Sequence, residues 1–329
     1  MNIKRWIERR EGSWRKLEQL LQRAEKKGLG RLSTPEVKEL ASLYRSVSAD
    51  LARARTAKLG QTLVQDLQSL TTRAYSQIYQ GARRQEWQGV WRFCLWGFPA
   101  AIQANGGYIA LATAIFLGGG LVGWWFAWQD PSFLRLVVPL GLIDLVQEEG
   151  ELWMGSILGV EPMASSNIMI NNIGVSFKTM AGGMTLGLLT VYILFFNGLL
   201  IGAIATLVGQ NNLALPFWAF VCPHGALELP AIFMAGGAGL LLARGLLLPG
   251  RYGRRDALKY YGLRAVQLMY GIVPLLVIAG TIEGFLSPNP GIPDILKYLM
   301  GAAIFGGLVA YCSRQPQQTA TVDSDYRPQ

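Results

Sequence analysis

Four ionisable side chains lie in or beside long apolar stretches of this 329-residue chain and are its best candidates for chemistry. His224 is the single histidine, and Glu228 follows it by four residues, so a helix places both on one face. Lys178 and Glu283 lie in two other apolar stretches. Ionisable groups are costly inside a membrane span, so each marks a functional candidate by default. A histidine with a glutamate suits proton transfer, but that pair alone is weak evidence for catalysis.

These side chains predict a partly buried polar cluster toward the outer membrane face. In this cluster Lys178 compensates the charge of one of the two glutamates, and His224 hydrogen-bonds a carboxylate. Amide side chains are expected to extend the same layer: Asn171, Asn172, Gln210, Asn211 and Asn212. The competing interpretation is a set of helix caps and snorkelling side chains at the interface, with Glu228 favoured by the positive end of its own helix.

Enzyme motifs are absent from the sequence. A single histidine excludes a zinc site with two His ligands, and no HExxH, GxSxG or Walker A motif occurs. The three cysteines, Cys94, Cys222 and Cys312, are too widely spaced for a CxxC site and are expected to be small buried hydrophobes. We therefore expect no catalytic residue, no metal and no cofactor, and an intramembrane hydrolase ranks third among the interpretations.

The elements that must position these residues are membrane helices. A run of 49 residues, Thr179 to Leu227, contains no Asp, Glu, Lys or Arg. A helix rises about 1.5 Å per residue and the bilayer core is roughly 30 Å thick, so this run is too long for one crossing. Backbone amides in lipid need internal partners, which favours helices throughout. The sequence predicts an all-α, polytopic membrane protein.

Charge sets the predicted orientation. The stretch from Gln129 to Asn172 is acidic, whereas six Lys or Arg from Arg244 to Arg264 oppose only Asp256. Cytoplasmic loops carry an excess of Lys and Arg, so the basic stretch is predicted inside and the acidic one outside. About six spans then fit, with both termini cytoplasmic: Tyr108–Trp128, Ile173–Phe195, Asn197–Val221, Ala226–Ala243, Val266–Phe285 and Ile295–Cys312.

The third of these spans is interrupted by Gly209 and Pro216, so a broken or re-entrant helix is an alternative there. Small residues also recur four apart in several spans, in the pairs Gly119 with Gly123, Gly183 with Gly187 and Gly198 with Gly202. Such spacing lets helix backbones approach closely. Packing within the chain is the preferred interpretation, and a homodimer interface is the alternative.

The chain before the spans is basic. Its first 100 residues carry 19 Lys or Arg against 9 Asp or Glu. No nucleic-acid-binding motif accompanies this excess, so no nucleic acid partner is expected, and a cytoplasmic face beside anionic lipid explains it better. We expect a helical domain over residues 1–92, a transmembrane domain over 93–313 and a disordered tail over 314–329.

Apolar stripes place the helices of the basic domain. One stripe runs from Trp6 to Leu21, a second from Val37 to Leu51 after a helix start at Ser33, and a third from Leu63 to Tyr75. A small helical bundle buries these stripes together. A docking surface for a soluble partner is the alternative use of them.

Several segments together resemble the stage II sporulation protein M family of integral membrane proteins. They are LSTPEVKELASLYRSVSADLARAR from Leu32, RAYSQIY from Arg73, NNIGVSF from Asn171, FFNGLLIGA from Phe195, PHGALELPAIFMAGGAGL from Pro223 and IEGFLSP from Ile282. The resemblance implies a multi-spanning protein of the bacterial cytoplasmic membrane. Positions that match the family motif are Asn171, Asn172, Asn197, Gly198, His224, Gly225 and Glu228, without an assigned chemistry.

The family's namesake anchors peptidoglycan-degrading partners at the membrane, which implies a scaffold with membrane or cytoplasmic protein partners. We therefore expect a non-enzymatic protein that anchors partners at the membrane. The alternative is a channel or transporter-like protein that uses a broken helix and the segment from His224 to Glu228.

Overall fold

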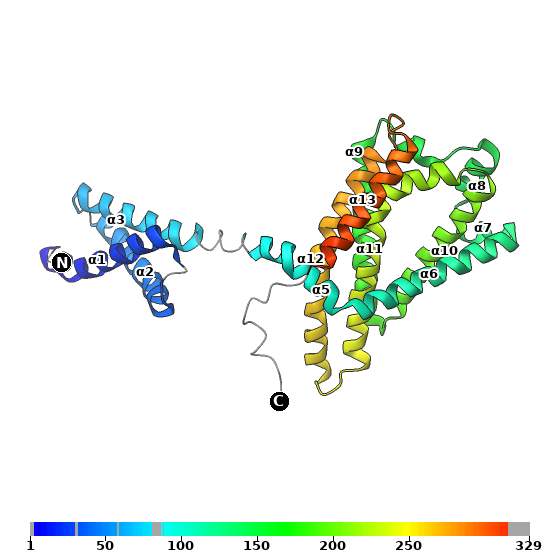
Figure 1. Cartoon of the computed structure of the whole chain (residues 1–329). Coiled ribbons are helices and arrows are strands. Elements are labelled where there is room, and N and C mark those ends of the chain that lie inside the picture. The colour runs from blue at the N-terminus through cyan, green and yellow to red at the C-terminus, as the bar shows by residue number, and fades with distance from the viewer. Residues whose placement is uncertain (1–2, 30–31, 58, 81–86, 88, 315–329) are drawn as a thin grey trace. The chain divides into compact units, whose positions relative to one another are not determined.

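The computed structural model describes residues 3–29, 32–57, 59–80, 87 and 89–314. Within these residues every regular element is helical, which confirms the all-α fold class. The chain divides into two compact units, Met1–Phe93 and Cys94–Gln329, and each is described by itself (Figure 1). Except for Arg314, the tail predicted to be disordered lies outside the described residues.

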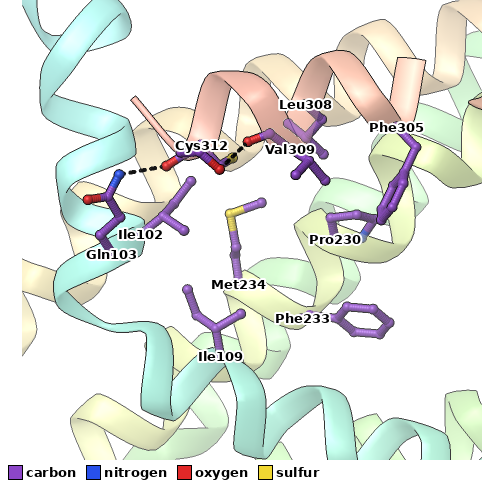
Figure 2. A pocket seen from close by; sticks show the side chains of 11 residues that line it. Ile102, Gln103, Ile109, Pro230, Phe233, Met234, Phe305, Leu308, Val309 and Cys312 are labelled. Carbon is purple, nitrogen blue, oxygen red and sulfur yellow. Dashed lines mark hydrogen bonds between the residues drawn. The ribbon is translucent and has the colours of Figure 1, made fainter. Parts of the chain in front are cut away.

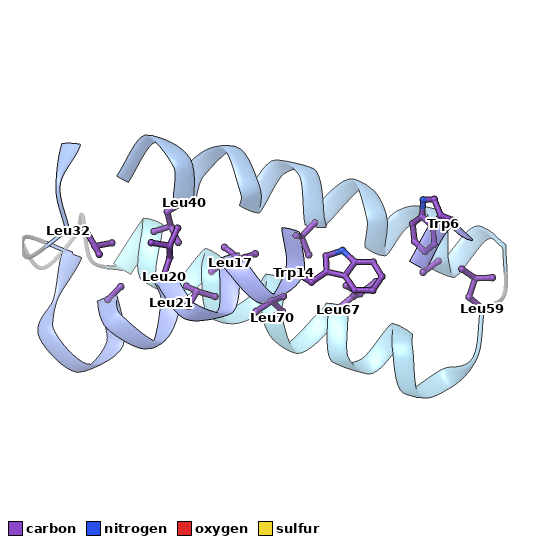
Figure 3. Close-up of a cluster of buried hydrophobic side chains, with 14 residues drawn as sticks. Trp6, Trp14, Leu17, Leu20, Leu21, Leu32, Leu40, Leu59, Leu67 and Leu70 are labelled. Carbon is purple, nitrogen blue, oxygen red and sulfur yellow. The ribbon is translucent and has the colours of Figure 1, made fainter. Parts of the chain in front are cut away.

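The first unit is a bundle of helices α1 (Ile3–Lys27), α2 (Thr34–Thr56) and α3 (Gln61–Tyr75), with a π-helical turn η2 (Ser76–Gln80) after α3. The predicted stripes meet in one core (Figure 3), whose fully buried members include Leu17, Leu21, Leu40, Val47 and Leu67. Two predicted stripe residues are exposed instead: Val37 by 40% and Tyr75 by 53%. Leu40 and Ala74 near them are fully buried, so Val37 and Tyr75 lie off the buried faces of their helices.

A buried carboxylate ties α1 to α2. Asp50 is 1% exposed, and its Oδ2 accepts a hydrogen bond from Arg10 Nε at 2.7 Å and from Trp14 Nε1 at 3.0 Å. A buried charge needs such partners to offset its lost hydration. The contact therefore fixes how the two helices align as well as how close they lie.

The predicted start of α2 is confirmed, because Ser33 precedes the first helical residue. The Glu36 carboxylate accepts hydrogen bonds from the Ser33 backbone N–H at 2.8 Å and from Arg23 Nη1 at 2.7 Å. These contacts, with that of the Ser33 hydroxyl, lower the pKa of Glu36 to about 2. The ionised carboxylate thus holds the first turn of α2 and links it to α1.

The second unit contains, among its described residues, five helices that are long and apolar enough to cross a membrane. They are α6 (Gly106–Gln129), α10 (Leu188–Gln210), α11 (Ala214–Leu247), α12 (Arg254–Thr281) with its π-helical extension η8 (Ile282–Leu286), and α13 (Asp294–Cys312). Figure 1 shows α11, α12 and α13 side by side. Short elements precede α6: η3 (Phe93–Gly97) and α5 (Phe98–Ala104).

Between α6 and α10 the chain forms a run of short turns and then one longer helix. The turns are η4 (Pro131–Phe133), α7 (Leu134–Val137), α8 (Leu140–Asp144), η5 (Leu145–Glu149) and η6 (Trp153–Ile157). The longer helix, α9 (Glu161–Ala181), ends in the 3₁₀ turn η7 (Gly182–Thr185).

The boundaries predicted for the second and third spans are wrong. The chain breaks after η7, where Leu186 and Gly187 take positive φ values of 57° and 86°, and again at Asn212, with φ of 60°. These left-handed residues end the helix runs. The interruption at Gly209 to Pro216 is therefore a tight connection between α10 and α11, and the alternative of a broken third span is also wrong.

Helices α6 and α10 run parallel to each other at close range. Gly119 and Gly123 of α6 face Phe195 and Leu199 of α10 in the same order, and Gly198 and Gly202 face Phe116 and Gly120. A Cβ atom at any of the four glycines would overlap a carbonyl oxygen of the facing helix. The predicted packing of these small residues within the chain is confirmed, and the approach is possible only because they lack side chains.

The parallel pair determines the path of the chain. Since α6 and α10 point the same way and both end in one apolar cluster that contains Ala127 and Leu207, the chain must return between them. Helix α9 has 21 residues, or roughly 31 Å, and is long enough to do so. Its Asn, Ser and Lys residues explain why it is too polar to count among the five. If α9 also crosses, the path has six crossings; the number of crossings and the side of each terminus stay predictions.

We predict that Gly202→Ala weakens the membrane unit, because its methyl group would meet the Gly120 carbonyl on a backbone that has little room to shift. Overpacking of this kind costs about 1–3 kcal/mol. Thermal unfolding of the detergent-purified chain should show a lower midpoint. Gly118→Ala is the matched control, because nothing lies within 4 Å of a Cβ there, and it should leave the midpoint unchanged or higher. Equal midpoints for both variants would contradict the close packing.

A second prediction concerns pH. Because the folded-state pKa of Glu36 lies below its ordinary value of 4.5, its contribution to stability is present above pH 4.5 and is lost as the pH falls toward 2. Denaturant unfolding of the fragment 1–93 should therefore show Glu36→Gln to be less stable than the parent at neutral pH and equal to it near pH 2. Glu8→Gln, at an exposed position of α1, should change little at either pH. A Glu36→Gln deficit that persists at pH 2 would refute this assignment.

Candidate functional site

Helix α11 is the centre of the membrane unit and packs against α6, α9, α12 and α13. It carries two internal prolines, Pro223 and Pro230, on either side of His224 and Glu228. Proline removes a backbone hydrogen bond from a helix and bends it. Helix α12 changes to π-helical geometry in η8, where Glu283 lies. Such π turns are frequent at functional sites because they redirect a side chain.

These two irregular segments bring three of the predicted site residues together. One ligand atom each from His224, Glu228 and Glu283 lies within 4.8 Å of the others, and His224 Nε2 lies 3.9 Å from Glu283 Oε2. His224 is only 5% exposed. The Oε2 atoms of both glutamates are fully buried and have no hydrogen-bond partner within the described ranges. The predicted cluster of these three residues therefore exists, with two unsatisfied carboxylate oxygens in it.

Ser287 is a fourth member that the sequence interpretation missed. Its hydroxyl lies 3.1 Å from His224 Nδ1, and the residue is 1% exposed. The predicted hydrogen bond from His224 to a carboxylate is not formed, because 3.9 Å is too long. The signal was available, since Ser287 follows Glu283 by four residues in the IEGFLSP segment.

A small cavity opens beside the cluster. It has a volume of about 140 Å³ and is lined by His224, Gly225, Glu228 and Glu283 together with apolar and aromatic side chains. Trp153 of η6 is among its walls, so the loop between α6 and α9 covers the site. Ser287 does not line it. The site thus combines three ionisable residues in the lining of a mainly apolar cavity with a serine hydroxyl set against Nδ1 of the His224 ring.

Lys178 does not take part in the cluster, and its predicted pairing with a glutamate is wrong. Its side chain is exposed, and no ion pair involves it within the described part of the chain. Its neighbour Thr179 packs its carbonyl against Gly239, which follows His224 by 15 residues, or roughly 22 Å along α11. The misplaced boundary of the second span caused this error, because it placed Lys178 near the wrong face.

The amide residues are also separate from the cluster. Asn171 is exposed and donates to Asn172 Oδ1 at 3.3 Å on the same helix. Asn197 and Asn211 donate to carbonyls one turn earlier in α10, Ile193 and Leu207. These four amides form hydrogen bonds within their own helices, and no hydrogen bond joins them to His224 in the described part of the chain. Of the motif positions, Gly225 lines the cavity, and Gly198 belongs to the contact between α6 and α10.

The cysteines are less buried than predicted. Cys94 is exposed, and Cys222 and Cys312 are half-buried. Cys312 lies at the rim of a second, apolar cavity of about 310 Å³ between α5, α6, α11 and α13 (Figure 2). Met234, Phe233 and Phe305 form much of its wall, and Gln103 closes one end by donating to the Cys312 carbonyl at 2.7 Å. Apart from the Cys312 thiol, no ionisable side chain of the described residues lines this cavity.

Comparison with known proteins identifies the membrane unit. The model of the stage II sporulation protein M family matches residues 112–288, which is more than half of the chain. This chain belongs to that family. The matched region extends from α6 to the turn after η8 and contains His224, Glu228, Glu283 and Ser287. The whole candidate site thus lies in the part of the chain that the family shares.

The first unit matches a different model, a domain of unknown function (DUF8413), over residues 4–80. Two relatives from Methanocaldococcus jannaschii are uncharacterized proteins. MJ0793 is 29% identical over 125 residues, which cover 37% of this chain and 70% of the relative. MJ0706 is 25% identical over 105 residues, which cover 31% of this chain and 47% of that relative, about half of its length. No solved structure matches the chain.

Proposed function

We propose that this member of the stage II sporulation protein M family is a non-enzymatic scaffold that anchors partner proteins at the cytoplasmic membrane. The observation that carries the proposal is the division of the chain into a membrane unit and a helical unit with its own core, each matched by a separate family model. A separately folded unit attached to membrane helices suits a protein that holds something at the bilayer.

The surface of the helical unit supports this role. Its ion pairs are mainly on the outside, as in the pair of Arg73 with Glu25. Against this polar background Tyr75 and Tyr79 are exposed by 53% and 55%, and the centroids of their rings lie 4.6 Å apart. Exposed tyrosines combine large contact area with a polar tip and are enriched at protein interfaces. We assign the docking surface to this pair and to the end of α3.

The candidate site supports a non-enzymatic protein less directly. Its cavity of about 140 Å³ is small for a substrate, and Ser287 Oγ, the hydroxyl nearest to His224, does not face that cavity. A serine nucleophile must reach the substrate and have its base beside it.

The basic connection between α11 and α12, with Arg251, Arg254 and Arg255, agrees with a cytoplasmic position for that end of the membrane unit.

Site-specific photo-cross-linking in cells tests the scaffold. A photoreactive amino acid at Tyr75 or Tyr79 should form a discrete adduct with a protein partner, and Tyr75→Ser with Tyr79→Ser should reduce co-purification of that partner at least tenfold without changing membrane insertion. The matched control is Thr62, exposed at the start of the same helix, α3. Adducts that are equal at Thr62 and Tyr75, or none at all, would contradict the assigned surface.

The buried carboxylates beside a cavity favour a second candidate, a channel or transporter-like protein. Its test is labelling of Gly225→Cys in a chain whose native cysteines are replaced, because Gly225 lines the cavity. A transport pathway predicts that a membrane-impermeant thiol reagent reaches this position from both faces under different conditions. A scaffold predicts protection from at least one face throughout, with Gly209→Cys at the connection between α10 and α11 as the labelled control.

A further inference from the structure

We propose that His224, Glu228 and Glu283 bind a divalent transition-metal cation of the Zn²⁺ or Mn²⁺ class within the membrane unit. This site goes beyond the scaffold function and does not depend on it.

Two glutamates meet inside the membrane unit with their Oε2 atoms fully buried, and neither atom has a hydrogen-bond partner among the residues that the structure describes. The Lys178 side chain, predicted to compensate them, is exposed and lies near the opposite end of α11, and no Lys or Arg forms an ion pair with either glutamate in the described residues. Burying a carboxylate without a partner is costly, and two that face each other add repulsion. A divalent cation would neutralise both at once.

The ligand atoms of the three residues are close enough to share a cation, since they lie within 4.8 Å of one another. A cation with bonds of about 2.1 Å places neighbouring ligands roughly 3 Å apart and opposite ligands roughly 4.2 Å apart. Small rotations of the two glutamate side chains therefore suffice to close the set around an ion. The cavity of about 140 Å³ beside the cluster has room for waters to complete the coordination.

The ring of His224 lies between Ser287 and Glu283. Its Nδ1 lies 3.1 Å from the Ser287 hydroxyl, and its Nε2 lies 3.9 Å from Glu283 Oε2. If Nδ1 carries the proton and donates to Ser287, the Nε2 lone pair faces the two carboxylates. This is the arrangement that metal-binding histidines adopt, with the second nitrogen held by an outer partner. Ser287 is then a positioning residue for the ligand.

The donor set selects the class of cation. One imidazole nitrogen with two carboxylate oxygens suits Zn²⁺, Mn²⁺ or Fe²⁺, whereas Mg²⁺ and Ca²⁺ prefer oxygen ligands alone. An open position toward the cavity would remain after three protein ligands have bound. The alternative occupant of the cluster is a proton shared by the two carboxyl groups, which needs no metal and predicts no selective uptake of Zn²⁺.

The test uses the full chain, purified in detergent and stripped with a chelator. Equilibrium dialysis against micromolar Zn²⁺ in millimolar Mg²⁺ should show one tightly held Zn²⁺ per chain. Glu228→Gln and Glu283→Gln should each lower the affinity at least tenfold, and Ser287→Ala should lower it by about 10–100-fold. Glu149→Gln, which removes an exposed acid of the same unit, is the matched control and should bind as the parent does.

Two further measurements distinguish loss of the metal site from loss of the fold. The thermal midpoint of each metal-free variant should equal or exceed that of the metal-free parent, because an amide is cheaper to bury than an unpartnered carboxylate. Co²⁺ added to the parent chain should give visible absorption bands typical of nitrogen and oxygen ligation, which needs no variant. The proposal is overturned if the parent holds no Zn²⁺ tightly in the presence of millimolar Mg²⁺, or if Glu228→Gln and Glu283→Gln bind Zn²⁺ as tightly as the parent and the Glu149→Gln control do.

Discussion

The close parallel contact between α6 and α10 is the constraint on which the membrane unit depends. Four glycines allow the two backbones to meet directly, and in lipid such packing replaces the hydrophobic drive that joins helices in water. Because the pair is parallel, the chain between the two helices must cross back. Helix α9 is the element that returns between them, although its own sequence is polar.

The directions of the later helices explain why the polar cluster forms where it does. Helix α11 starts beside the end of α10, so His224 and Glu228 lie near that end of the bundle. Helix α12 ends on the same side, where its π turn brings Glu283 against α11. The irregular backbone at Pro223 and in η8 is thus concentrated at the cluster, while Lys178 is carried to the far end by the course of α9.

Much of this fold was predictable from the sequence, because charge and apolar runs report directly on the bilayer. The apolar stripes of the first unit, the helix start at Ser33 and two of the three glycine pairs follow from local patterns. The third pair, Gly183 with Gly187, lies in the turn before α10, and the number of crossings stays a prediction. The positions of the two helix breaks, before and after α10, could not be predicted in this way. Within a continuous apolar run, hydrophobicity cannot say where a helix turns; that depends on the left-handed residues Leu186, Gly187 and Asn212.

The candidate site, too, was predictable only in part. The i and i+4 spacing of His224 and Glu228 was visible, but their meeting with Glu283 and Ser287 depends on how α12 packs against α11, which one sequence does not contain. Because the second span was misplaced, Lys178 was predicted to lie beside these glutamates and to neutralise one of them. Without that lysine the two carboxyl groups, on two packed helices, have no Lys or Arg partner among the described residues. A cation at this point would join α11 to η8 and stabilise the packing of α12, so ion binding and a rigid membrane anchor are compatible in one molecule.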